Sequence, residues 1–136
     1  MNEPTRIIRN YHPADFDKYV RLNIEAKKLD PGGHCIITQV IAENLARPNY
    51  SPQQDLFLAE IAGSIIGYMD VTPELIIGRV TLDCWVHPKY RRRGLGTGLL
   101  DYAMRRAREL GVKIAHVNIM EDNLVARRIL SGLGFG

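Results

Sequence analysis

The sequence predicts an α/β fold, a mixed sheet that is antiparallel in its first part and parallel later, with helices on both faces. Three observations predict it. Strand-like stretches in the first half are joined by short turns, and a stretch of helical period lies between two strand-like stretches in the second half. The chain has 136 residues, the size of one ordinary domain. We therefore expect a single domain over residues 1–136.

The amino-terminal part of the chain predicts one strand and two helices. Residues 5–10 (TRIIRN) are typical of a short strand. Residues 12–30 start with a proline and an acidic first turn and then place apolar side chains at helical spacing, so we expect a helix that ends before Pro31. A second helix is expected over residues 36–46, where a proline-containing stretch stops it.

Three strands are expected next. Residues 55–61 (DLFLAEI) and 65–71 (IIGYMDV) flank a turn at residues 62–64, which predicts a hairpin. Residues 75–86 (LIIGRVTLDCWV) form a third, longer run rich in β-branched side chains. The connections are too short for helical crossovers, so these strands are predicted to be antiparallel.

The apolar period becomes helical after residue 94. Residues 95–110 predict a helix that ends at Gly111, and residues 113–119 alternate as a strand. Residues 79–119 then form a strand, helix and strand, which implies a parallel, right-handed crossover. The apolar stripe of the helix comprises Leu95, Leu99, Ala103, Ala107 and Leu110.

The last predicted element is a helix over residues 122–135. Asp122 and Asn123 are both residue types that favour the helix cap. In the strand before it, alternation separates a buried face from a second, more polar face. The buried face is expected to hold Ala115, Val117 and Ile119, and the other face His116 and Asn118.

The stretch HPKYRRRGLGTGLL, residues 87–100, combines three consecutive arginines with glycines at alternate positions. Glycine lets a backbone approach a ligand closely, and the first amides of a helix attract phosphate. A Walker A loop would need a lysine after the glycines, and a dinucleotide fingerprint would need G-x-G-x-x-G directly after a strand, so both fit poorly. Taken alone, the stretch is explained equally well by a tight turn with solvated arginines.

The same stretch resembles the acetyl-coenzyme A signature of the GCN5-related N-acetyltransferases (the GNAT family). It has a strand-ending Val, a Pro two residues later, and Arg91, Gly94 and Gly96 at the positions of the signature Arg/Gln-x-x-Gly-x-Gly/Ala. The order of the predicted elements agrees over essentially the whole chain. This resemblance implies the acyl-CoA N-acyltransferase (GNAT) fold.

A second motif supports the resemblance. NLVARRILSGLGF is similar to the family pattern N-x-x-A-x-x-x-Y-x-x-x-G-F, with Asn123, Ala126, Gly134 and Phe135 in place. By the resemblance, acetyl-coenzyme A is the co-substrate and no metal is needed. The glycine turn would cradle the coenzyme's pyrophosphate, and the backbone around Cys84 would pair with its pantetheine arm where the parallel strands separate. The coenzyme-binding residues implied are Cys84, Val86, Arg91, Arg92, Arg93, Gly94, Leu95, Gly96, Thr97 and Asn123.

The chain departs from the family at the two positions that handle protons. The usual glutamate is Asn118, and the usual tyrosine is Leu130. An alkylammonium has a pKa near ~10.4 and must lose a proton before it attacks, so another group has to act. The candidate catalytic residues are His116, Asn118 and Asp83, although a structural role explains each of them as well.

We expect an N-acetyltransferase in which a primary amine attacks acetyl-coenzyme A directly. Two alternatives stay open: a catalytically degenerate, coenzyme-binding or structural half of a tandem acetyltransferase, and a basic nucleic-acid-binding module. The family usually continues with further strands after the Gly-Phe pair, whereas this sequence stops at Gly136. The C-terminal strands would then come from a longer chain, a second GNAT domain or a homodimer.

Charge and composition limit the kinds of partner that we expect the protein to bind. Residues 89–136 carry 10 Lys/Arg against 4 Asp/Glu, whereas residues 1–88 carry 8 against 11, so an anionic partner is expected downstream. The acceptor is expected to be a small-molecule or peptide amine rather than a nucleic acid. No apolar run reaches the ~20 residues that span a bilayer, and the two cysteines lack metal-ligand spacing. We expect a cytoplasmic protein that does not bind membranes.

Overall fold

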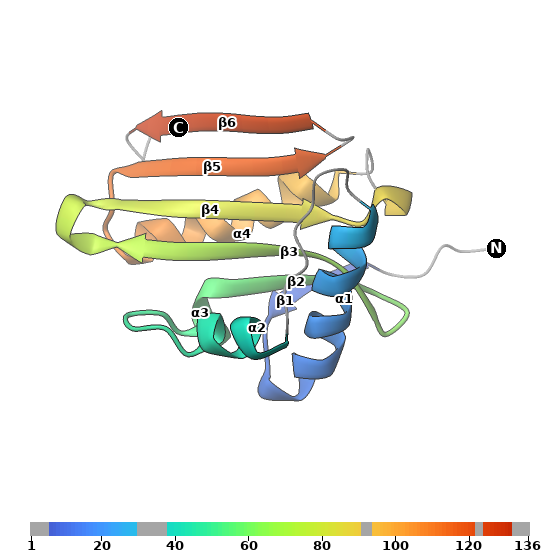
Figure 1. The fold of residues 1–136 in the computed structure, drawn as a ribbon. Helices are drawn as coiled ribbons and strands as arrows, with labels where there is room; N and C mark the ends of the chain where they lie inside the picture. Colours follow the sequence, from blue (N-terminus) through green and yellow to red (C-terminus); the bar gives the residue numbers. More distant parts are fainter. Residues whose placement is uncertain (1–5, 30–37, 91–93, 122–123, 132–136) are drawn as a thin grey trace.

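A six-stranded sheet, with its strands in the order in which they occur in the chain, forms the centre of the computed structural model (Figure 1). The structure describes residues 6–29, 38–90, 94–121 and 124–131, and their side chains except those of 26–29 and 117–131. All neighbouring strands are antiparallel except β4 and β5, which are parallel. The strands are β1 Arg6–Asn10, β2 Leu56–Ile61, β3 Ser64–Glu74, β4 Arg79–Val86, β5 Ile114–Glu121 and β6 Leu124–Ser131.

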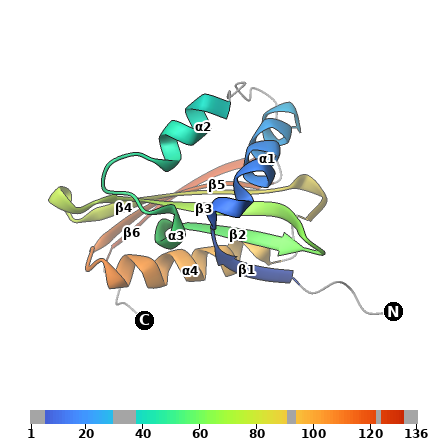
Figure 2. The ribbon, with the colours of Figure 1, turned by 90° about the horizontal axis from the view of Figure 1, so that it is seen from below.

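Helices cover both faces of this sheet, as predicted. Figure 2 shows α1 and α2 on one face and α4 on the other. The α-helices are α1 Phe16–Leu29, α2 Thr38–Leu45, α3 Pro52–Asp55 and α4 Leu95–Glu109, and the 3-10 helices are η1 Pro13–Asp15, η2 Leu75–Ile77 and η3 Pro88–Tyr90. The parallel unit β4, α4 and β5 confirms the predicted crossover.

Side-chain alternation along β4 divides the interior into two cores. Val80, Leu82 and Cys84 lie in the core beneath α4, whereas Trp85 lies in the core beneath α1 and α2. Because a strand sends successive side chains to opposite faces, one strand contributes to both cores. The predicted stripe of α4 is confirmed, since Leu95, Leu99, Ala103 and Ala107 are buried and Leu110 packs against the same core.

The helix predicted over residues 122–135 is wrong for its described part, because residues 124–131 form strand β6. The two strands pair from Glu121 with Leu124 to Ile114 with Ser131. Only two residues separate β5 from β6. Asp and Asn favour tight turns as much as helix caps, so these two residue types do not distinguish a hairpin from the start of a helix. Pairing also gives the backbone of β5 a second neighbour.

The long strand predicted over residues 75–86 is shorter than expected. Residues 75–77 form the 3-10 turn η2, and β4 begins at Arg79. Pairing of β3 with β4 ends at Glu74 and Arg79, so the residues between them must reverse the chain. Gly78 supplies the left-handed conformation, with φ of 67°, that closes this turn.

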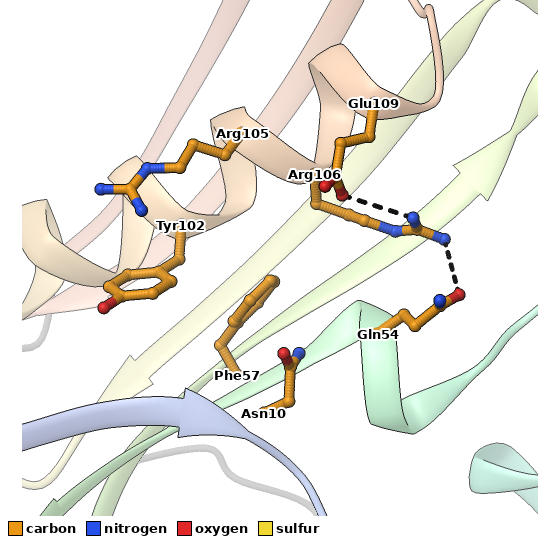
Figure 3. Close-up of a pocket in the computed structure, with 7 residues that line it drawn as sticks. All are labelled: Asn10, Gln54, Phe57, Tyr102, Arg105, Arg106 and Glu109. Atoms are coloured by element: carbon orange, nitrogen blue, oxygen red, sulfur yellow. Dashed lines mark hydrogen bonds and ion pairs between the residues drawn. The ribbon is translucent and has the colours of Figure 1, made fainter.

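A buried ion pair connects α4 to α3. Nε of Arg106 lies 2.7 Å from Oδ1 of Asp55, whose side chain is only 2% exposed. Oδ2 of the same carboxylate accepts a hydrogen bond from the Ser51 amide at 2.9 Å. Figure 3 shows the Arg106 guanidinium pointing toward Gln54, while Arg105 extends away from it over Tyr102.

We expect Arg106→Met to lower the free energy of unfolding by about 3 kcal/mol, because it leaves a buried carboxylate without its cation. The neighbouring substitution Arg105→Met is the matched control and should cost at most ~1 kcal/mol, since its guanidinium lies over an aromatic ring near the surface. Urea unfolding of the two variants measures the difference. Equal losses would contradict a structural role for the ion pair.

Candidate functional site

The glycine-rich turn forms the amino-terminal end of α4. Gly94 is its cap residue, with φ of 80°, and its carbonyl accepts the first helical hydrogen bond from the Gly98 amide at 3.0 Å. The amides before Gly98 therefore have no acceptor within the helix. Among the residues that the structure describes, no atom lies within 4 Å of a Cβ added at Gly94, so these residues leave the turn open to a ligand.

This turn has the electrostatic character that an anion requires. The helix has 15 residues, and its first turn contains no acidic side chain. Its dipole and unpaired amides favour a phosphate at this end. Leu95, Gly96 and Thr97 all lie in the first turn, as the sequence predicted for a pyrophosphate cradle. Residues 91–93 and 123, which are also predicted to bind the coenzyme, lie outside the described residues.

A cavity of about 290 Å³ lies on the other face of the sheet, between the sheet and the α1 and α2 side. Strands β3 and β4 form its floor. It combines aromatic rings with two carboxylates and one arginine, which suits a polar, cationic ligand better than an apolar one. Its lining residues are Tyr19, Asn23, Ile41, Asn44, Leu45, Arg47, Tyr50, Tyr68, Asp70 and Asp83.

Asp70 is the carboxylate with the most altered environment in this cavity. Nη2 of Arg47 lies 3.2 Å from its Oδ1 and 3.3 Å from its Oδ2, and the same nitrogen donates to Thr72 Oγ1 at 2.9 Å. Burial raises the pKa of Asp70 and the negative charge of Asp83 adds to this, although Arg47 and Tyr50 act in the opposite direction. Desolvation is the largest of these effects, so the carboxylate is a stronger base than an exposed one.

The Tyr50 hydroxyl is buried beside this carboxylate. Among the described residues it has no hydrogen-bond partner in good geometry, although Asp70 is close enough to help raise its pKa above the usual range. The Arg47 guanidinium stacks on the Tyr50 ring, 3.4 Å from its centroid. A buried hydroxyl that lines a cavity and lacks a partner is a group that a ligand can satisfy.

The three predicted catalytic residues do not all lie at this cavity. Asp83 does, and it pairs in register with Asp70 on β3 and with Asn118 on β5. His116 pairs with Thr81, two positions along β4, and its charge acts on Glu74, which lies outside the cavity. The buried position predicted for Ala115 is confirmed. The side chains of Val117, Asn118 and Ile119 are outside the described set.

β4 and β5 stay paired as far as Trp85, so any separation of the parallel strands begins beyond this residue. Cys84 pairs with Ile119, and Trp85 pairs with Met120. Val86 lies one residue beyond this last pair and is in register with Gly67 of β3. A coenzyme arm beside Cys84 would therefore require the last pairs of the ladder to open. The Cys84 side chain is buried in the apolar core beneath α4.

Arg47, Tyr50 and Asp70 carry the polar chemistry of the cavity but are not among the site residues that the sequence predicts. Asp70 carried a signal, since it is an acidic residue within a strand-like, mostly apolar run. Arg47 and Tyr50 lie in the irregular segment after α2, where no periodicity marks which side chains face inward. Their positions depend on how this segment folds over the sheet.

A second cavity, of about 370 Å³, lies on the α4 face (Figure 3). Its lining contains Arg106, whose charge is already paired with Asp55 and Glu109. None of the predicted site residues that the structure describes lines it. The described residues include no group of His, Cys, Asp and Glu able to hold a metal ion. No helix in the described ranges is long and apolar enough to cross a membrane.

Comparison with known proteins agrees with the fold. The sequence model of the Acetyltransferase (GNAT) family matches residues 9–135. No curated protein matches the sequence significantly. Many solved structures are similar, and three of them have TM-scores of 0.65, 0.65 and 0.69. They are Ard1 from Thermoplasma volcanium, yncA from Salmonella typhimurium, and a tandem GNAT protein from the clavulanic acid biosynthesis pathway.

These structures share the fold at low sequence identity. Ard1 is 20% identical, with 87% of this chain and 74% of that chain covered. The yncA structure, a putative acetyltransferase with its cofactor acetyl-CoA, is 20% identical over 85% of this chain and 70% of that one. The tandem protein is 18% identical over 84% of this chain but only 36% of its own length.

We expect Tyr50→Phe to leave the free energy of unfolding unchanged or to raise it by up to ~1 kcal/mol, because it removes a buried hydroxyl for which the described part of the chain offers no good partner. Tyr50→Leu removes the ring beneath Arg47 as well and should cost about 2 kcal/mol through lost stacking and packing. Thermal and urea unfolding distinguish the two variants. A loss above ~1 kcal/mol in Tyr50→Phe would mean that the hydroxyl is hydrogen-bonded in the free protein.

Proposed function

The chain belongs to the Acetyltransferase (GNAT) family, and from this we propose that it is an N-acetyltransferase that moves an acetyl group from acetyl-coenzyme A to a primary amine. The observation that carries the proposal is the family match over residues 9–135 together with the open glycine turn at the start of α4. The amine attacks the thioester directly while both substrates are bound.

The residues at the glycine turn fit the coenzyme. The turn offers main-chain amides, the positive end of the α4 dipole and space at Gly94 for a phosphate. Arg91, Arg92 and Arg93 directly precede this turn in the sequence and supply counter-charge. When bound there, acetyl-coenzyme A provides the activated acetyl group, and the chain's own residues bind and orient it.

The cavity under α1 and α2 is the proposed acceptor site. Asp83 lines it and lies three residues, or about 10 Å, before the carboxyl end of β4, where the chain turns toward Gly94. One strand therefore leads from the acceptor cavity to the coenzyme turn. Holding two reactants close together in a fixed orientation supplies a large part of an enzyme's rate enhancement.

Two alternatives predict other outcomes. A non-catalytic half of a tandem protein would bind the coenzyme without acetylating amines, and a tandem GNAT protein is among the similar structures. A nucleic-acid-binding module would need the arginines of α4 to be available for phosphates, but Arg106 is already held by Asp55 and Glu109. The second alternative is therefore the weaker one.

We expect acetyl-coenzyme A to raise the melting temperature, because a ligand at 100 times its Kd stabilises the folded state by about 2.7 kcal/mol. Gly96→Leu should abolish this shift, since Gly96 lies buried in the first turn of α4. Thermal unfolding with and without coenzyme measures both. No shift at millimolar coenzyme would contradict the proposed function and the tandem alternative together.

A matched pair of glycines separates binding from stability. Gly94 and Gly111 lie at opposite ends of α4, both have positive φ, and an added Cβ would be unobstructed at both. Each substitution by alanine should cost about 1 kcal/mol of unfolding free energy through backbone strain. Only Gly94→Ala should also weaken acetyl-coenzyme A binding, by at least ~10-fold, or ~1.4 kcal/mol. Equal affinities in the two variants would place the coenzyme elsewhere.

A further inference from the structure

We propose that the cavity between the sheet and the α1 and α2 side takes a compact, cationic primary amine and that Asp70 accepts the proton which this amine must lose. The inference rests on the proposed function and names the acceptor class and the proton acceptor of that site. The family's two usual proton-handling positions hold Asn118 and Leu130 in this chain. Neither an amide nor a leucine side chain can take this proton. The cavity supplies a carboxylate instead.

The charges around the cavity favour a cation. Asp70 and Asp83 are register partners on β3 and β4, and each carboxylate lines the cavity. The charge of Asp83 acts on Asp70, so an ammonium group between them would relieve the repulsion. The lining contains one cation, Arg47, and it already contacts Asp70 and Thr72 and stacks on Tyr50.

Asp70 keeps capacity to accept a proton despite its contact with Arg47. A single nitrogen of Arg47 reaches both oxygens, at 3.2 and 3.3 Å, which is longer than the ~2.8 Å of a strong charge-assisted hydrogen bond. Lone pairs on both oxygens are left for a ligand. Asp15 offers a contrast, since two nitrogens of Arg9 hold it at 2.8 and 2.9 Å.

The groups that face Asp70 support this role. They are Arg47 and Tyr50 from the segment after α2, Tyr19 from α1, and Asp83 from β4. Within the described ranges the Tyr50 hydroxyl has no well-placed partner, and it can accept a hydrogen bond from an ammonium or donate one to a ligand oxygen. The tyrosine rings add cation–π attraction for the charged head group.

Cavity size limits the acceptor. A cavity of about 290 Å³ has room for a small organic amine. A small alkyl or arylalkyl amine fits this space, whereas a folded protein surface does not. The acceptor class is therefore a compact amine whose charged end lies at Asp70 and Asp83.

Atoms and charges balance in an acetyl transfer that uses Asp70 as the base. The ammonium gives one proton to the Asp70 carboxylate, and the neutral nitrogen forms a bond to the acetyl carbonyl carbon. The carbon–sulfur bond breaks, and the coenzyme leaves with its electron pair and takes up the second proton of the nitrogen as a thiol. Asp70 then releases its proton to solvent. A thiol has a pKa near ~8.5, so this leaving group needs no dedicated acid.

The test measures thiol release from acetyl-coenzyme A with 1,4-diaminobutane, 2-phenylethylamine and a ten-residue lysine peptide as acceptors. We expect the two compact amines to be acetylated at least ~10-fold faster than the peptide. Asp70→Asn should lower kcat for the faster amine by ~10²- to 10³-fold and leave the thermal shift with acetyl-coenzyme A unchanged. The matched control Glu74→Gln should stay within ~2-fold, because Glu74 is on the same strand and paired with Arg79 outside the cavity.

The pH profile separates a proton acceptor from a structural residue. With Asp70 present, kcat/KM should be flat from neutral pH toward the pKa of the amine. In Asp70→Asn only the free amine reacts, so kcat/KM should rise about tenfold per pH unit up to that pKa, near ~10.4 for an alkylamine. Asp70→Glu, which retains the carboxylate, should restore the flat profile even if Asp70→Asn folds poorly.

Several results would overturn the inference. They are an unchanged pH profile in Asp70→Asn, preference for the peptide, a tenfold-per-unit profile in His116→Ala instead, or no acetylation of any amine by a protein that binds the coenzyme. Absence of the coenzyme thermal shift is a different failure, because it contradicts the proposed function itself. The two failures are therefore distinguishable.

Discussion

The two-residue alternation of β4 is the constraint on which the rest of the structure depends. Val80, Leu82 and Cys84 are buried beneath α4, and this leaves Asp83 and Trp85 on the opposite face. A shift of one residue in register would exchange the two sets and bury a carboxylate in the apolar core. The apolar face thus fixes which polar side chains can reach the cavity under α1 and α2.

The same strand sets the relation between the two proposed binding regions. Its carboxyl end leads through η3 to the open turn at Gly94, where the amides of α4 face outward. Its middle lies beneath the cavity, in register with Asp70 on β3. On the α4 side the buried pair of Arg106 and Asp55 holds the helix against α3. The helix that presents the glycine turn is therefore anchored at its other end.

The polar cavity depends on segments far apart in the chain. Arg47 and Tyr50 come from the segment after α2, whereas Asp70 lies on β3. Burial raises the pKa of Asp70 and of Tyr50, whereas the charge of Arg47 lowers both. A carboxylate in this environment is a candidate base for reasons that its neighbours in sequence do not reveal, because desolvation is a property of the folded state.

The sequence by itself determined the α/β class, the parallel crossover over residues 79–119, the stripe of α4 and the glycine turn, because each depends on local period or on glycine geometry. It predicted a helix after Glu121 where the chain forms strand β6, because Asp and Asn favour a helix cap and a tight turn alike, and it did not place Arg47 and Tyr50. Only the tertiary structure joined Asp70 to Asp83 and set His116 apart from them, because cross-strand register and burial arise from contacts distant in sequence.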